Sequence, residues 1–229
     1  MWLSDLIGLI YPEICCACNQ RLTKQEETIC LHCIYSLPKT NFLKYDDNPI
    51  ARHLWGRVPF EHATSMFYFT KKGLIQNLMY ELKYNGRYDV GLKLGVNLGT
   101  ALKEISFWKE IDMILPVPLH PKKLKSRGYN QSDAIAEGMA EAMDIVTDPS
   151  VLKRVKFNKS QTKKGKLERW SNVENIFELN DAEKVKGKHV LLIDDVLTTG
   201  STLEACAETL LKVEGLKVSI ATLACAESF

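Results

Sequence analysis

Residues 190–202, VLLIDDVLTTGST, place two adjacent carboxylates just ahead of a run of hydroxyl side chains. Four apolar residues lead into Asp194 and Asp195, and a further apolar pair separates these from the hydroxyls. Adjacent carboxylates repel each other and are costly to bury, so they need a cation or hydroxyl donors as partners. The vicinal hydroxyls of a ribose, with Mg²⁺ close by, satisfy that requirement.

The hydroxyl run predicts an anion-binding loop. A helix is expected from about Ser201, and the free N–H groups and positive dipole end at a helix start attract anions. A glycine lets the backbone approach a ligand closely, which suits a phosphate. The predicted phosphate-binding residues are Thr198, Thr199, Gly200, Ser201 and Thr202. Carboxylates for a sugar diol, followed by a phosphate cradle, predict a site for a phosphorylated ribose.

The competing interpretation is that Ser201 only caps a helix and that the aspartates are exposed loop residues. The complete order of strand, Asp-Asp, Thr-Thr-Gly-Ser-Thr and helix is more demanding than either feature alone. Neither the Gly-Lys-Thr of a Walker loop nor the G-x-G-x-x-G of a dinucleotide site occurs in the sequence.

The cysteines favour a metal site near the N-terminus. Five of the seven cysteines fall within 19 residues, and two C-x₂-C pairs are separated by eleven residues. Such pairs place four thiolates tetrahedrally around Zn²⁺. The predicted ligands are Cys15, Cys18, Cys30 and Cys33. All four come from the protein, so the site is expected to be structural, and zinc would supply folding energy to a segment with little core of its own.

Other interpretations of the cysteines remain open. The pairs also suit buried free thiols or a redox pair. Cys16 is surplus to the four ligands, and His32 is a competing ligand. Cys206 and Cys225 lie in or beside a predicted helix and strand, where packing is their expected role.

Composition and patterning predict a soluble α/β protein. The chain has 229 residues, 45% apolar and 25% charged, with a net charge of +2. No apolar run is long enough to span a membrane, and residues 1–10 resemble a short amphipathic helix packed on the body rather than a signal peptide. A cytoplasmic location follows by default.

Strands alternate with helices along the chain, which predicts a parallel sheet with ligands bound beyond its carboxyl ends. The expected strands are 63–70, 112–117, 189–194 and 217–224, and the expected helices are 73–84, 89–104, 130–143 and 201–213.

The stretch VLLIDDVLTTGST closely resembles the phosphoribosyl pyrophosphate (PRPP) signature of type I phosphoribosyltransferases. LPVPLHPKKLKSRGYNQS at 115–132 and Lys83 in ELKYNGR resemble segments of the ComF family. Gln161, Arg169, Asn172 and Phe177 match a further block of that family. The resemblance implies an α/β fold: a Rossmann-like core with a mostly parallel sheet flanked by helices, and a small N-terminal four-cysteine zinc finger. It divides the chain into a finger segment at 1–45 and a phosphoribosyltransferase-like domain at 46–229, with a basic hood at about 148–184.

By this resemblance Asp194 and Asp195 are the catalytic residues that hold the ribose hydroxyls, and Thr198 to Thr202 hold the 5′-phosphate. The loop 118–128 would face the pyrophosphate through Lys122, Lys123, Lys125 and Arg127. Arg127 is the first choice because guanidinium matches phosphate bidentately. A solvated basic loop is the alternative, and His120 between prolines is expected to be structural rather than a general base.

Two functions remain open at this point. The first is transfer of a phosphoribosyl group from PRPP with magnesium to an unidentified nucleophile, with release of pyrophosphate and a link to competence and DNA uptake. The second is a PRPP sensor without turnover that binds single-stranded DNA or a competence partner. The basic segment 151–170, with eight Lys or Arg and two aromatic residues, suits a nucleic-acid backbone, a lid over PRPP or a solvated loop. The acceptor and the oligomeric state are not predicted.

Overall fold

The computed structural model describes residues 12–155 and 176–227. The helix expected at residues 1–10 lies outside these ranges. So do Gln161, Arg169 and Asn172, and most of the basic segment 151–170.

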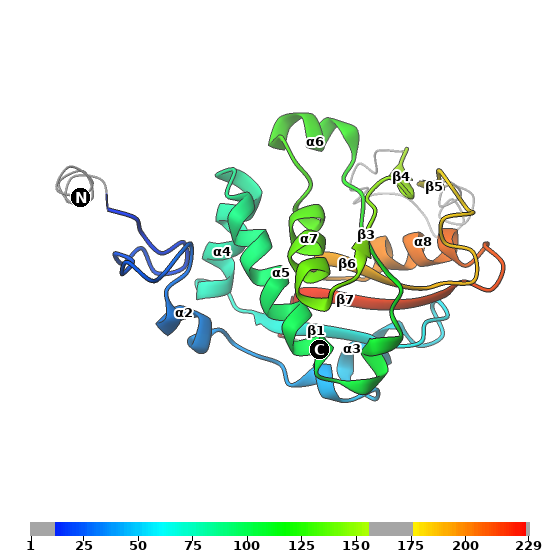
Figure 1. The fold of residues 1–229 in the computed structure, drawn as a ribbon, viewed down its shortest axis with the longest axis horizontal. Helices are drawn as coiled ribbons and strands as arrows, with labels where there is room; N and C mark the ends of the chain where they lie inside the picture. Colours follow the sequence, from blue (N-terminus) through cyan, green and yellow to red (C-terminus); the bar gives the residue numbers. More distant parts are fainter. Residues whose placement is uncertain (1–11, 156–175, 228–229) are drawn as a thin grey trace, which may run out of the picture.

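A five-stranded parallel sheet forms the centre of the molecule (Figure 1). Its strands, in spatial order, are β1 (Ala63–Phe69), β7 (Lys217–Ala226), β6 (His189–Leu197), β2 (Met113–Pro116) and β3 (Val146–Thr147). The two central strands, β6 and β7, read as nearly continuous apolar runs, which is typical of parallel strands buried on both faces. The predicted parallel sheet is therefore confirmed.

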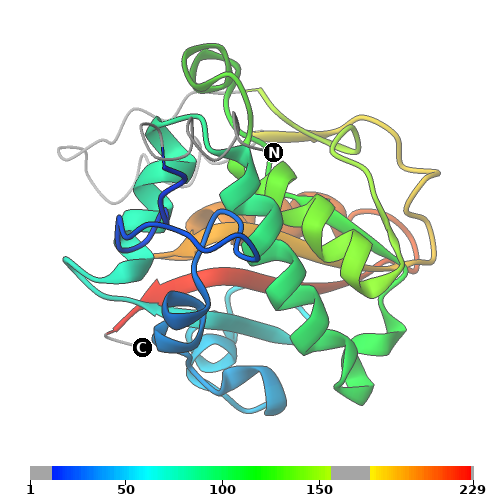
Figure 2. The same ribbon diagram turned by 60° about the vertical axis from the view of Figure 1, so that its left-hand side comes forward.

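Helices cover both faces of the sheet, as Figures 1 and 2 show. One face carries α4 (Leu74–Tyr84), α5 (Tyr88–Lys103) and α7 (Gln131–Met143), and the other carries α3 (Pro49–Leu54) and α8 (Ser201–Leu210). Successive residues of β6 point to opposite faces, so Leu191 and Ile193 join one core and Val190 and Leu192 join the other. The result is a three-layer α/β/α arrangement.

Shorter elements complete the described chain. They are α2 (Leu31–Ser36), α6 (Pro121–Arg127), the 3₁₀ helices η1 (Phe42–Lys44) and η2 (Ser106–Glu110), and an antiparallel pair of strands, β4 (Leu152–Arg154) and β5 (Phe177–Leu179). None of the helices in the described ranges is long and apolar enough to cross a membrane.

Three local expectations differ from the structure. Strand β6 was expected to end at residue 194 but continues to Leu197, so both aspartates lie inside the strand. Residues 121–127 form the helix α6 instead of a loop, because His120 caps an N-terminus that starts with Pro121. The pair β4 and β5 was missed because three-residue strands carry almost no periodic pattern.

Candidate functional site

A cleft opens at the carboxyl edge of the sheet, where β1, β6 and β7 end. Its volume is about 810 Å³, which lies within the range of about 300–1,000 Å³ that is typical of small-molecule sites. The cleft is lined by Phe69, Thr70, Lys71, Lys83, Asp195, Val196, Thr198, Ala226 and Glu227. Two of the predicted site residues, Asp195 and Thr198, therefore face the same cavity.

The two aspartates have different partners. Asp195 Oδ2 lies 2.9 Å from Lys83 Nζ, and only 14% of the Asp195 side chain is exposed. Asp194 Oδ1 accepts hydrogen bonds from Ser132 Oγ at 3.1 Å and from the Asp195 backbone N–H at 2.9 Å. Ser132 stands in the first turn of α7 and Lys83 in the last turn of α4, so two helices of one layer meet the carboxylates.

The pKa of Asp194 is raised from 3.8 to about 7. Burial is the largest cause and the charge of Asp195 the second, while the hydrogen bonds and Lys83 act in the opposite direction. A raised pKa means that the free protein stabilises the carboxylate form of Asp194 poorly. Further hydroxyl donors or a cation at this position would favour its ionised form.

The hydroxyl loop follows Leu197 and leads directly into α8. Thr198, Thr199 and Ser201 are exposed, and Thr199 Oγ1 lies 3.2 Å from Ser201 Oγ. Gly200 is the residue before the helix and has a φ of 78°, a left-handed conformation that favours glycine. The N-cap is therefore Gly200, and Ser201 is the first helical residue. The competing interpretation, in which Ser201 caps the helix, was wrong on this point. The loop exposes hydroxyl groups at the start of a ten-residue helix.

The basic residues of α6 lie in a different setting. Lys122 and Lys123 are exposed, and neither they nor Arg127 are among the residues that line the described cleft. The guanidinium of Arg127 stacks over Tyr84 at 5.8 Å and donates to the Gln131 side chain. Contact of these residues with pyrophosphate stays a prediction.

His120 has a structural role in the described chain. Its Nδ1 accepts a hydrogen bond from the Lys122 backbone N–H at 3.1 Å, which caps α6. Burial is the largest of the causes that lower its pKa, and nearby cations add to it.

Sequence reasoning missed Lys71 and Ser132, and it noted Lys83 only through the resemblance. Lys71 follows β1 at the same edge as Asp195, so the rule that ligands bind at carboxyl ends, applied to every strand, would have found it. Ser132 lies in the first turn of α7, and only the packing of α7 against β6 brings its hydroxyl to Asp194.

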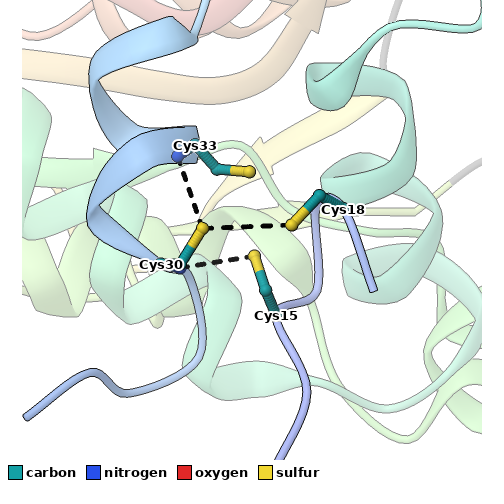
Figure 3. Close-up of side chains that lie close together, drawn as sticks. All are labelled: Cys15, Cys18, Cys30 and Cys33. Carbon is teal, nitrogen blue, oxygen red and sulfur yellow. Dashed lines mark hydrogen bonds between the residues drawn. The ribbon is translucent and has the colours of Figure 1, made fainter. Parts of the chain in front are cut away.

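The four predicted metal ligands lie together near the N-terminus (Figure 3). The Sγ atoms of Cys15, Cys18, Cys30 and Cys33 all lie within 4.8 Å of one another, and three of these residues are buried. The first two come from a loop, Cys30 precedes α2, and Cys33 lies inside that helix. Four mutually close sulfur atoms are the donor set and spacing of a structural zinc site, so the cluster fits a zinc finger.

Backbone amides donate to two of these sulfur atoms. Cys15 Sγ accepts from the N–H of Ala17 at 3.4 Å. As Figure 3 shows, Cys15 Sγ also accepts from the N–H of Cys30 at 3.3 Å, and Cys30 Sγ accepts from the N–H of Cys33 at 3.4 Å. Burial raises the pKa of Cys15, but the amide donors together outweigh it and lower the pKa to about 7. These donors favour the thiolate form of Cys15, which is the form that binds metal. Burial has the larger effect at Cys30 and Cys33 and raises the pKa of both thiols.

The remaining cysteines and His32 stand apart from the cluster. Burial raises the pKa of Cys16 to about 11, as expected for an unreactive thiol, and His32 is exposed. Cys206 and Cys225 are both fully buried, in α8 and β7, in agreement with a packing role.

The cysteine segment packs on the helical layer next to the cleft. Asn77 of α4 donates from Nδ2 to the Ala17 carbonyl at 2.8 Å, and Thr28 donates from Oγ1 to Asp89 of α5 at 2.8 Å. Cysteine residues and helix residues also share one hydrophobic core. The cysteine segment therefore packs against α4, the helix that carries Lys83.

Comparison with known families identifies the class of this fold. Residues 127–228 match the model of the phosphoribosyl transferase domain. That range contains α7, β6, the two aspartates, the hydroxyl loop and α8. The chain thus has a phosphoribosyltransferase-type α/β fold, with a four-cysteine cluster near its N-terminus.

Full-length relatives narrow the class. The chain is 28% identical over 218 residues to the DNA utilization protein YhgH of Salmonella typhimurium, covering 92% of this chain and 90% of the relative. It is 26% identical over 220 residues to the competence protein ComFC of Bacillus subtilis, covering 94% and 86%. The chain is a homologue of these proteins, which confirms the resemblance to the ComF family.

A solved structure of glutamine PRPP amidotransferase from B. subtilis, in complex with ADP and GMP, is similar at a TM-score of 0.41 and 22% identity. The similarity covers 62% of this chain and 30% of that one.

Proposed function

We propose that the protein binds PRPP with magnesium and transfers its phosphoribosyl group to a nucleophile, with release of pyrophosphate. The observation that carries this proposal is the meeting of Asp195, Lys83 and Thr198 in one cleft, with Asp194 and the start of α8 beside them. Carboxylates suit a ribose diol and a helix start suits a phosphate. The match to the phosphoribosyl transferase domain supports the same substrate.

In this proposal, different residues at the carboxyl edge of the sheet bind different parts of PRPP. Asp194 and Asp195 accept hydrogen bonds from the ribose hydroxyls, and Thr198 to Thr202 donate to the 5′-phosphate. Lys71 and Lys83 add positive charge to the cleft, and Lys122, Lys123 and Arg127 of α6 would approach the pyrophosphate from above the strand ends. The protein thereby contributes positioning and charge stabilisation rather than a covalent intermediate.

The bond from ribose C1 to pyrophosphate breaks as the new bond from C1 to the nucleophile forms, and the electron pair leaves with pyrophosphate. Magnesium neutralises charge on that leaving group when it is bound. The carboxylates and the pyrophosphate oxygens are the hard oxygen donors that Mg²⁺ prefers.

We infer further that Cys15, Cys18, Cys30 and Cys33 hold a structural zinc ion. The proposed organisation is a zinc-finger segment in residues 1–45 and a phosphoribosyltransferase-like domain in residues 46–229. The hood at about 148–184 would begin and end at the β4 and β5 pair, which brackets the part of that segment outside the described residues.

A second candidate is a PRPP sensor that acts in DNA uptake through single-stranded DNA or a protein partner. The names of the relatives, which refer to DNA utilization and competence, favour a link to these processes. The two candidates share PRPP binding and differ in turnover.

Calorimetric titration with PRPP and Mg²⁺ tests the shared step, and a saturable 1:1 isotherm is expected. Magnesium-dependent pyrophosphate release, screened against bases and amines, then separates transferase from sensor. A sensor would bind PRPP without release and would bind single-stranded DNA with an affinity that falls steeply with salt. Absence of PRPP binding would refute both candidates.

A further inference from the structure

The hydroxyl loop at residues 198–202 is held by Arg57, which is 142 residues from Thr199 in the sequence. Arg57 Nη1 donates to the Thr199 carbonyl at 2.7 Å, and Arg57 Nη2 lies 2.7 Å from Glu204 Oε2 in the first turn of α8. His53 Nε2 lies 3.2 Å from the same carbonyl and 2.9 Å from Arg57 Nη1. One guanidinium thus connects the loop and the helix that follows it.

The chain around Arg57 is built to present this side chain. Asn48 caps α3 by accepting from Ile50 and Ala51 and also donates to the Ala63 carbonyl of β1, which fixes the helix on the sheet. Gly56 has a φ of 74°, a left-handed conformation that turns the chain after α3. The Arg57 side chain is 29% exposed and Glu204 27%, so the pair is partly shielded from solvent.

Arg57 fixes the direction of one peptide group. The peptide bond is planar and trans, so its C=O and N–H point in opposite directions. Because Arg57 holds the Thr199 carbonyl, the N–H of Gly200 points away from Arg57. A Cβ atom at Gly200 would lie 3.3 Å from Arg57 Nη1 and 3.1 Å from Leu54 Cδ2. Arg57 and Leu54 therefore pack closely against the glycine and leave little room for a side chain there.

We propose that Arg57 is a positioning residue that orients the Thr199–Gly200 peptide so that the Gly200 N–H joins the amides of the α8 start in binding the 5′-phosphate. Arg57 does this without touching the ligand. The proposal rests on the proposed function, since it assigns to Arg57 the geometry of the phosphate loop. It also gives Arg57 a second effect, because its charge offsets Glu204, a carboxylate placed one turn from the expected phosphate.

Calorimetry with three ligands tests the proposal: PRPP with Mg²⁺, ribose 5-phosphate, and pyrophosphate with Mg²⁺. Arg57→Ala is expected to weaken PRPP and ribose 5-phosphate by about tenfold, the scale of one lost charge-assisted hydrogen bond, and to leave pyrophosphate unchanged. Arg57→Lys is expected to recover part of the loss, because an ammonium can still reach the Thr199 carbonyl but lacks the planar fork that bridges to Glu204. Glu204→Gln, which removes the opposing charge, should not weaken either phosphate ligand.

The resonance of the Gly200 amide in the ligand-free protein provides an independent measurement. It is expected to shift in Arg57→Ala before any ligand is added, which direct contact of Arg57 with phosphate would not require. Unchanged affinity of Arg57→Ala for ribose 5-phosphate, or equal weakening of pyrophosphate, would overturn the proposal. If the wild type itself fails to bind PRPP, the proposed function fails instead, and a Gly200 amide that stays unshifted in Arg57→Ala then refutes the orienting role as well.

Discussion

The cysteine cluster and the aspartate pair both bring groups of like charge together, but they resolve the repulsion differently. The four sulfur atoms lie within 4.8 Å of one another, and Cys15 and Cys33 are fully buried. Asp195 lines an open cleft of 810 Å³ and pairs with Lys83, while Asp194 beside it accepts a hydrogen bond from Ser132. The closed cluster suits a permanent ion, whereas the open pair suits a ligand that comes and goes.

The two regions also differ in what holds them in place. The cysteines come from a loop and the six-residue helix α2, and they pack against α4 and α5. The aspartates sit on the nine-residue strand β6, hydrogen-bonded to neighbours on both sides. We expect a short segment of this kind to need bound metal to stay folded. The strand should keep its geometry with or without PRPP.

Removal of the metal is the strongest way to break this comparison. The double variant Cys15→Ser, Cys18→Ser is expected to lose its zinc and to unfold the finger segment, because structural zinc supplies on the order of 10 kcal/mol of folding free energy to such segments. Elemental analysis and hydrogen exchange of residues 12–37 measure both effects. Exchange in β6 and β7 should rise far less.

Cys16→Ala is the matched control, since Cys16 lies in the same Cys-Cys-Ala-Cys run but outside the cluster. It should retain one zinc per chain. Wild-type protein that purifies with no metal and protects residues 12–37 fully would refute the zinc assignment.

The aspartate pair predicts the next largest effect. Asp194→Asn with Asp195→Asn is expected to weaken PRPP by at least about 100-fold, because two charge-assisted hydrogen bonds to the ribose are lost at about 1.5–3 kcal/mol each. The fold should persist, because the substitutions remove the repulsion between the two carboxylates, and Lys83, which loses its partner, borders the open cleft where water can solvate it. Calorimetry and circular dichroism measure the two outcomes.

Asp47→Asn provides the control, because Asp47 pairs with Arg52 on the exposed surface. Its PRPP affinity should equal that of the wild type. Unchanged affinity in the double variant would remove the aspartates from the site.

Lys83 predicts a smaller effect, and one on stability. Lys83→Met leaves Asp195 without its cation beside Asp194, and we expect a loss of about 1–3 kcal/mol at pH 8 for this partly buried pair. The loss should shrink at pH 5, because Asp194 is then protonated and no longer repels the Asp195 carboxylate that has lost its cation. Denaturant unfolding at both pH values measures the difference.

Lys186→Met is the matched control, since Lys186 pairs with Glu214 at 3.4 Å on the exposed surface. A change within about 0.5 kcal/mol is expected there. Equal losses for the two variants would mean that the Lys83 pair is no more important than a surface contact.

The sequence predicted the regions in which chemistry and local pattern coincide. The parallel sheet, four of its strands, the helices α4, α5, α7 and α8 and the cysteine cluster all agree with the structure, because each has a clear apolar period or a spacing set by coordination. The start of α8 was predicted at Ser201 for the same reason.

Contacts between distant segments were not predictable in this way. The bond of Ser132 to Asp194 and that of Arg57 to Thr199 depend on how helices pack against the sheet. Short elements such as β3, β4 and β5 escaped because two or three residues show no period. The roles of the α6 residues are still a prediction, since their side chains do not line the described cleft.

The pH dependence of PRPP binding tests whether the ligand supplies the partners that the aspartate pair lacks in the free protein. The pKa of Asp194 is about 7 in the free protein and 3.8 ordinarily. Between these values the folded state binds more protons than the unfolded state, so the contribution of Asp194 to the free energy of unfolding falls as the pH rises from about 4 to 7. Affinity for PRPP should move in the opposite direction, since ribose hydroxyls and Mg²⁺ favour the carboxylate.

A rise in PRPP affinity of about tenfold between pH 6 and pH 8 is expected, with up to one proton released on binding at the lower pH. Titrations in two buffers of different ionisation enthalpy count that proton. The single variant Asp194→Asn keeps the shape of the side chain but cannot titrate, so its weaker binding should follow only the ionisation of PRPP itself. If PRPP affinity changes with pH in the same way in the wild type and in the variant, Asp194 binds the ligand without changing its charge. The charge state of the aspartate pair, like the sulfur geometry of the cysteine cluster, would then be fixed before the ligand binds.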